Sequence, residues 1–216
     1  MEGSSPIRLI WNEWGRVTRF IKSSAIAFER EEASWGSLHV TDKKATLISK
    51  ASGPSHYELS VVDHLKALRQ GRVLPGAVLL YSYALTESYA RLKLGLSDDD
   101  ELDGGVESWG GKLLTQTGHD WDAVLEGRAG IIEVSAVRNA MAHGVHKVTQ
   151  AMVSRFESHD LPSPWSVGDS IILDLGKLDL YRSRLKSLMR ISDNKKKAQA
   201  VIASHRDLLR VVGKRS

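Results

Sequence analysis

The chain has 216 residues, of which 42% are hydrophobic and 26% charged, a composition typical of one medium-sized globular domain with a buried core. It contains no cysteine, which excludes disulfides, thiol catalysis and cysteine-ligated zinc. Its apolar runs are too short to span a bilayer, and Met1–Trp14 lacks the basic start and apolar middle of a secretory signal. We therefore expect a cytoplasmic protein that does not bind a membrane.

The net charge of +4 is unevenly distributed along the chain. Of 30 basic and 26 acidic residues in total, eleven basic and two acidic ones lie in residues 182–216, a balance of +9. The other 19 basic and 24 acidic residues lie in residues 1–181, a balance of −5. Such a basic end indicates either a polyanion partner or a solvated tail that aids solubility, and the pattern leaves both open.

The N-terminal part predicts a long helix over residues 7–32, because apolar side chains recur every three or four positions. The repeating residues are Ile10, Trp14, Val17, Ile21 and Ala25. Glycine and proline interrupt residues 35–55, which predicts a short extended or helical piece. We expect residues 1–54 to form a helical extension before the main domain.

Two helices are predicted next. The S-x-x-E sequence Ser55–Glu58 is a capping box, which predicts a helix over residues 55–70. Pro75 is well placed for the first turn of a second helix, which continues through Ala77–Leu94 and ends at Gly95. The first half of this second helix is apolar on nearly every side, so we expect it to be the buried central helix.

The middle of the chain predicts weaker elements. The acidic segment Ser97–Asp103 indicates a solvated loop, because it lacks the ligand order of a calcium-binding loop. Residues 106–117 predict a short helix, and Asp120 can cap a further one. We expect Gly127 and Gly130 to interrupt that helix before the next one begins.

The stretch Val137–Val148, VRNAMAHGVHKV, carries the main functional candidates. It lies in a helical pattern that Gly144 can end. Asn139 and His143 share one face of such a helix, and the long Arg138 side chain can swing into the same groove from about 140° away. Arginine can stabilise phosphoryl charge, and histidine can transfer protons near neutral pH. The alternative is an ordinary helix end with a surface arginine and a histidine favoured by the helix dipole.

The C-terminal third predicts three further elements. Residues 151–156 indicate a short helix, and residues 166–175 contain a β-like core at Ser170–Leu173. A last helix is expected around Leu180–Met189. Residues 192–216 predict a basic helix or tail.

The segment R-N-A-M-A-H-G at residues 138–144 resembles the signature of the HEPN domain family, an all-helical family rich in metal-independent endoribonucleases. Residues 77–94 resemble the long apolar helix that precedes the signature helix in these domains. The resemblance covers residues 55–191. It implies a mainly all-α fold, namely an antiparallel helical bundle with a small β element near residues 166–175.

The same resemblance implies RNA cleavage by attack of the ribose 2′-hydroxyl on the adjacent phosphate, which leaves a 2′,3′-cyclic phosphate and a 5′-hydroxyl. In this chemistry His143 is the general acid or base, Arg138 stabilises the phosphate oxygens, and Asn139 orients the phosphate or the imidazole. Three further residues are candidates for substrate binding: His146, Lys147 and Glu87. No cofactor is expected and no metal site either, since the chain has no H-E-x-x-H sequence.

The resemblance also implies a homodimer, because one chain supplies one motif histidine. It indicates a toxin–antitoxin or phage-defence role, with tRNA or other cellular RNA as substrate and an antitoxin or defence-system protein as partner. Toxins of this family that are neutralised by nucleotide transfer often carry a tyrosine where this chain has Val145. One alternative is a non-catalytic HEPN-like module that binds RNA, a nucleotide or a protein. Another is a helical regulatory protein whose basic end binds DNA.

Overall fold

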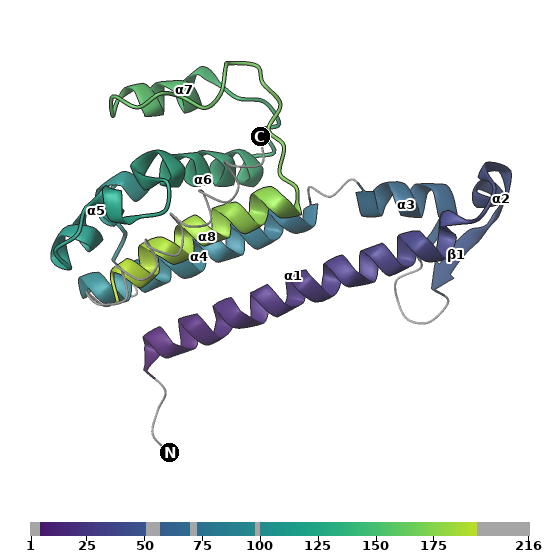
Figure 1. Cartoon of the computed structure of the whole chain (residues 1–216), viewed down its shortest axis with the longest axis horizontal. Coiled ribbons are helices and arrows are strands. Elements are labelled where there is room, and N and C mark those ends of the chain that lie inside the picture. The colour runs from purple at the N-terminus through teal and green to yellow at the C-terminus, as the bar shows by residue number, and fades with distance from the viewer. Residues whose placement is uncertain (1–4, 51–56, 70–72, 98–99, 194–216) are drawn as a thin grey trace, which may run out of the picture.

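The computed structural model describes residues 5–50, 57–69, 73–97 and 100–193 (Figure 1). Most of these residues are helical and the described part contains one two-stranded sheet, so the predicted all-α class is confirmed. The helices are α1 (Pro6–Gly36), α2 (Val40–Ala45), α3 (Val61–Arg69), α4 (Val73–Leu94), α5 (Val106–Gln116), α6 (Gly127–Ala142), α7 (Gln150–Glu157) and α8 (Leu175–Ile191). A 3-10 turn, η1 (Trp121–Ala123), precedes α6, and the strands are β1 (Leu47–Lys50) and β2 (Tyr57–Ser60).

Helix α4 lies at the centre of the bundle, as its apolar sequence predicts, and α1, α5, α6 and α8 pack against it. The contacts of Ser82 with Arg182 and of Thr86 with Met189 show that α4 and α8 run parallel. Helices α1 and α6 run antiparallel to this pair (Figure 1). The bundle therefore mixes parallel and antiparallel neighbours. In the described ranges, none of the helices has the length and apolar character needed to cross a membrane.

Helix α1 confirms the predicted long N-terminal helix, and its first half belongs to the main core. Four of its apolar residues are buried against the bundle, namely Ile10, Trp14, Val17 and Ile21. The second half of α1 extends beyond the bundle toward α2, β1 and α3 (Figure 1). The N-terminal segment thus contributes a face of the shared core, and the division at residue 54 stays a prediction.

The capping-box prediction is wrong about where the third helix begins. Tyr57–Ser60 forms β2, which pairs antiparallel with β1, and α3 starts at Val61. The hydroxyl oxygen of Ser60 accepts a hydrogen bond from the Asp63 backbone N–H at 3.1 Å and donates to the Asp63 carboxylate at 2.7 Å. Ser60 and Asp63 therefore cap α3, five residues after the predicted site.

The predicted β element near residues 166–175 is smaller than a strand. An isolated antiparallel bridge joins Lys147 to Ser170, and the Ile171 N–H donates to the His146 carbonyl at 3.0 Å. Pairing stops within a few residues because Gly168 turns the chain in a left-handed conformation, with φ of 93°. After this turn, residues 170–174 lie beside the loop that follows α6 and lead directly into α8.

The motif helix α6 begins earlier than predicted, since Gly127 and Gly130 belong to it and do not lie between it and η1, the turn that Asp120 caps. Helix α6 begins at Gly127, which has φ of 62°, and continues through Gly130. A Cβ atom at Gly130 would lie 3.1 Å from Nε of Arg184, so the missing side chain makes room for this arginine. Glycine here serves close packing between α6 and α8.

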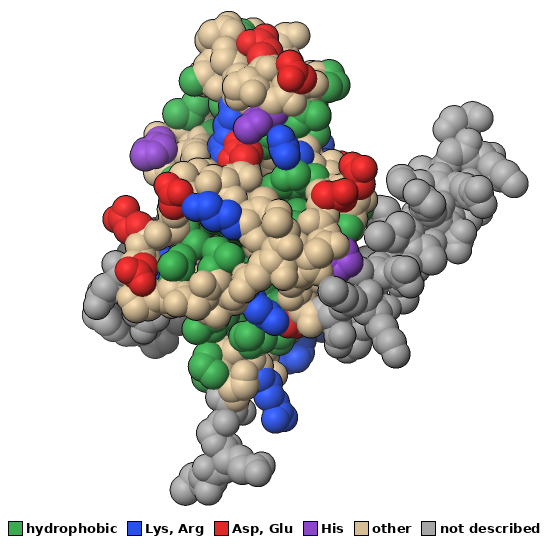
Figure 2. Space-filling view, turned by 90° about the vertical axis from the view of Figure 1, so that its left-hand side faces the viewer, with side chains coloured by type: hydrophobic (Ala, Val, Ile, Leu, Met, Phe, Trp, Pro, Cys, Tyr) green, Lys and Arg blue, Asp and Glu red, His purple; other side chains and the backbone are tan. Residues whose placement is uncertain are grey.

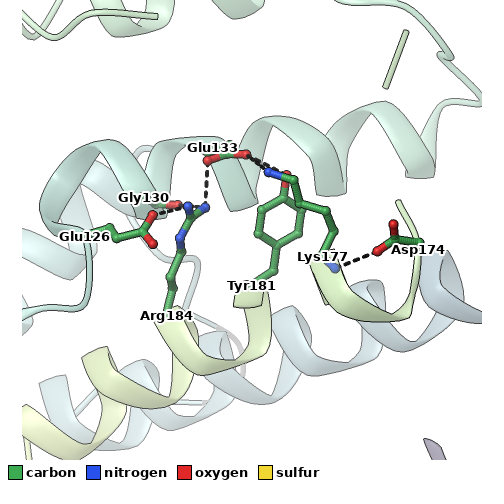
Figure 3. A network of polar contacts seen from close by, with 7 residues as sticks. All are labelled: Glu126, Gly130, Glu133, Asp174, Lys177, Tyr181 and Arg184. Carbon is green, nitrogen blue, oxygen red and sulfur yellow. Dashed lines mark hydrogen bonds and ion pairs between the residues drawn. The ribbon is translucent and has the colours of Figure 1, made fainter. Parts of the chain in front are cut away.

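A buried network of hydrogen bonds and ion pairs joins α6 to α8 (Figure 3). Glu133 accepts hydrogen bonds from Arg184 Nη1 at 2.8 Å and from the Tyr181 hydroxyl at 2.7 Å. Arg184 also pairs with Glu126, and Lys177 Nζ lies 3.4 Å from Glu133. Because buried charges are tolerated when they are paired and hydrogen-bonded, this network favours one alignment of the two helices.

Two arginines at the start of the basic region, residues 182–216, are buried. Arg182 and Arg184, which the sequence groups with the basic end, are 4% and 3% exposed and belong to the core. Residues 194–216, which include most of the predicted basic helix or tail, lie outside the described residues.

Candidate active site

The C-terminal end of α6 positions the three predicted catalytic residues. Arg138 and Asn139 lie near the end of the helix, and His143 is its C-cap residue. The His143 N–H donates to the Asn139 carbonyl at 3.1 Å, and the Val145 N–H donates to the Ala140 carbonyl at 2.8 Å. Gly144 ends the helix with φ of 65°, as predicted. This termination leaves Asn139 and His143 exposed.

Arg138 is held on the α4 side of α6. Its Nη1 donates to Oδ1 of Asn139 at 2.9 Å, and its Nη2 lies 4.0 Å from Oε2 of Glu87. The guanidinium carbon lies 5.0 Å from the ring centre of Tyr83. The Arg138 side chain is 32% exposed. Three neighbours therefore orient the guanidinium while part of it stays open to solvent.

Glu87 and Tyr83 give Arg138 a partly buried setting. Burial raises the pKa of Glu87, although the nearby Arg138 and Arg91 favour its charged form. Burial also raises the pKa of Tyr83 to about 12, so its hydroxyl stays protonated and donates to Ser135 at 3.2 Å. Oε2 of Glu87 lies 4.0 Å from Nη2 of Arg138, which is beyond hydrogen-bond distance, so Glu87 does not occupy this donor.

A groove of about 300 Å³ lies between α6 and α7, and both Asn139 and His143 line it. Most of its other walls are small or apolar side chains, namely Ala136, Ala140, Val145, Ala151 and Met152. Arg138 is not among the lining residues. In the structure its guanidinium instead lies on the α4 side, beside Tyr83 and Glu87, and the expectation that it can swing into this groove stays a prediction. Asn139 therefore links the other two motif residues, because it hydrogen-bonds to Arg138 and lines the same groove as His143.

Arg155 of α7 forms the opposite wall of the groove. It binds Glu107 of α5 in a two-pronged ion pair, with Nη2 donating to Oε2 at 2.6 Å. Burial alone would raise the pKa of Glu107, but the hydrogen bonds from Arg155 lower it. Sequence reasoning missed this pair, because 48 residues separate its members and neither lies in a recognisable motif.

The assignment of this site depends on its geometry. No family model, curated protein or solved structure matches the chain. The resemblance of residues 138–144 to the HEPN signature thus stays a hypothesis, and the contacts around Arg138, Asn139 and His143 are the observations that bear on it.

The three predicted substrate-binding residues lie in different surroundings. Glu87 contacts the motif through Arg138. His146 and Lys147 are exposed in the loop after α6, outside the residues that line the groove. Across the described ranges, no three histidine or acidic side chains are grouped so that they could hold a metal ion.

The surface near α5 carries no patch of a single charge. Figure 2 shows this end of the molecule, where acidic and basic side chains are interspersed with apolar ones. Phosphate backbones bind to concentrated positive charge, so this face does not have the character of an extended RNA-binding surface.

Proposed function

We propose that the protein is a metal-independent endoribonuclease of the HEPN type. It would cleave RNA by attack of the 2′-hydroxyl on the adjacent phosphate and leave a 2′,3′-cyclic phosphate and a 5′-hydroxyl. The observation that carries this proposal is the position of Asn139, which accepts a hydrogen bond from Arg138 and lines the same groove as His143. The guanidinium and the amide thus contact each other, and the amide and the imidazole border one groove, at the C-terminal end of one helix.

Each side chain has a role that fits its surroundings. Arg138 has one Nη engaged by Asn139, and its planar fork offers further donors to phosphate oxygens as charge develops on them. The exposed imidazole of His143 can transfer a proton to or from the reacting oxygens. Tyr83 and Glu87 restrict the arginine to one orientation, which lowers the cost of positioning it during the reaction.

The proposal includes a homodimer. Cleavage needs one group that removes the 2′-hydroxyl proton and another that protonates the leaving 5′-oxygen, and each chain offers one histidine in the motif. A two-fold axis would place two motifs together. The corresponding cellular role is that of a cytoplasmic toxin or phage-defence nuclease that acts on tRNA or other RNA, restrained by an antitoxin or defence-system partner.

A second candidate is a non-catalytic HEPN-like module that binds RNA, a nucleotide or a protein. Two observations favour it: the groove beside His143 has mainly apolar walls, and Arg138 already has Glu87 as a partner. A binding module would retain affinity for its ligand and leave RNA intact. The two candidates therefore differ in a cleavage assay.

The test compares single variants in an assay with purified chain and total RNA. We expect His143→Ala to abolish cleavage and Arg138→Ala to slow it on the order of 100- to 1,000-fold, the usual cost of losing one charge-stabilising donor. Arg128→Ala is the matched control, because Arg128 lies on the same helix about 15 Å away along its axis. His39→Ala is the histidine control at the start of α2. Wild-type activity in His143→Ala, with the fold intact by circular dichroism, would refute the assignment.

A further inference from the structure

A second cavity, of about 310 Å³, lies between α1 and α8. Helices α1 and α7 are on opposite sides of the bundle, so this cavity is separate from the groove beside His143 (Figure 1). Residues at helical spacing face it from both helices, namely Trp14, Thr18 and Lys22 from α1, and Asp179, Arg182 and Lys186 from α8.

Arg182 places a positive charge at the floor of this cavity. Its side chain is buried and its guanidinium carbon lies 4.5 Å from the ring centre of Trp14. Nη2 donates to Thr18 Oγ1 at 2.9 Å and to the Trp14 carbonyl at 3.4 Å, and Nη1 donates to Ser82. All of these acceptors are neutral.

In the described part of the chain, the hydrogen bonds of Arg182 all go to neutral acceptors, and Asp179 acts on its charge only from beyond ion-pair distance. Burial lowers the pKa of Arg182 to about 10, while the nearby Asp179 favours its charged form. Since it is costly to bury a cation without an anion, the cavity floor attracts negative charge.

Two lysines extend the positive charge to the rim. Lys22 is exposed and Lys186 is half-buried. Burial lowers the pKa of Lys186, and the positive charges of Arg190, Arg182 and Lys22 lower it further. Among the residues that line the cavity, three are basic and Asp179 is acidic, which gives a net charge of +2.

We propose that this cavity binds a phosphate dianion, either as free phosphate or as the terminal group of a small phosphomonoester. Such a group carries nearly two negative charges at neutral pH, which matches the lining residues, whereas each diester linkage of RNA carries one. The Arg182 guanidinium and the two lysines can supply charge-assisted hydrogen bonds. The volume is at the lower end of the range for small-ligand sites, so it holds a phosphate and a small organic group.

Isothermal titration of the full chain with inorganic phosphate, AMP and the diester ApA, at constant ionic strength, tests this proposal. We expect saturable binding of AMP or of phosphate at one site, and at least about fivefold weaker binding of ApA, which lacks a dianionic group. Tighter binding of AMP than of phosphate assigns the site to an organic phosphomonoester. Equal affinities assign it to the phosphate ion.

Variants then locate the site. The double change Lys22→Gln and Lys186→Gln should weaken binding on the order of tenfold, and it leaves the core residue Arg182 in place. Lys66→Gln on α3, which removes one exposed charge far from the cavity, is the control and should bind as wild type does. The proposal is overturned if no probe binds saturably, if ApA binds as tightly as AMP, or if the double variant keeps wild-type affinity. None of these readouts depends on RNA cleavage.

Discussion

Asn139 connects the two sides of the proposed catalytic site. Its side-chain oxygen accepts a hydrogen bond from Arg138 on the α4 side, and the residue also lines the groove that contains His143. Asn139 is exposed, so its side chain contributes little to the core. We infer that it acts as a positioning residue, which fixes the guanidinium relative to the imidazole.

This role predicts a coupled effect of two substitutions. Asn139→Ala should slow RNA cleavage roughly 10- to 150-fold, because a hydrogen bond to a charged group contributes roughly 1.5–3 kcal/mol. If Asn139 acts through Arg138, the double variant with Arg138→Ala should be no slower than Arg138→Ala alone. Single-turnover rates of the four proteins measure this. Losses that multiply in the double variant would instead indicate that Asn139 contacts the substrate independently.

At the scale of residues, the sequence predicts some neighbours and misses others. The four-residue spacing of Asn139 and His143 predicts that they share a face, and both line one groove. The position of Arg155 opposite them could not be predicted, because it depends on an ion pair with Glu107, 48 residues away. Local spacing does not encode contacts between distant segments.

At the scale of elements, the buried network between α6 and α8 holds the motif helix in place. Glu133 is 6% exposed and binds Arg184 and Tyr181. Burial opposes its charged form, but the positive charge of Arg184 outweighs this and lowers the pKa of Glu133 below its ordinary value of 4.5. A carboxyl whose pKa is lowered on folding stabilises the folded state above its unfolded pKa, and this contribution is lost as the pH falls.

We therefore expect Glu133→Gln to lower the free energy of unfolding by about 3 kcal/mol at pH 7, because one partner of a buried ion pair is removed while Glu126 still pairs with Arg184. The difference from wild type should shrink as the pH falls below 4.5, because the Glu133 carboxyl of the unfolded chain then takes up a proton before that of the folded protein does. Urea unfolding at pH 7, 5 and 3 measures it. The exposed control Glu101→Gln should change stability by less than about 0.5 kcal/mol. A difference that stays constant with pH would contradict the role of the Glu133 charge.

The hydrophobic spacing predicts where most helices lie, whereas their exact boundaries depend on tertiary contacts. Two serine–acid pairs, Ser55 with Glu58 and Ser60 with Asp63, match a helix start within one short stretch. The pairing of β1 with β2 decides between them, because it makes residues 57–60 extended. Strand pairing is non-local, so the sequence around either serine cannot reveal it.

At the scale of the whole molecule, the proposed homodimer determines how activity depends on the ratio of wild-type to inactive chains in a mixture. If each site needs His143 from both subunits, an equal mixture of wild-type and His143→Ala chains should keep about one quarter of the wild-type activity, because only wild-type dimers are active. The mixture is allowed to exchange subunits, and native mass spectrometry confirms the mixed dimers. Activity that falls in proportion to the wild-type fraction would show that each chain works alone.

The central claim is that this chain cleaves RNA with its own side chains, and the chemistry of the product ends tests it most directly. Purified wild-type protein is incubated with total RNA in excess EDTA, and the new termini are mapped, with His143→Ala as the negative control. The account predicts cleavage that persists in the chelator and yields 2′,3′-cyclic phosphate and 5′-hydroxyl ends. Cleavage that stops in EDTA and returns with magnesium, or products with 5′-phosphate ends, would contradict it and indicate metal-assisted hydrolysis.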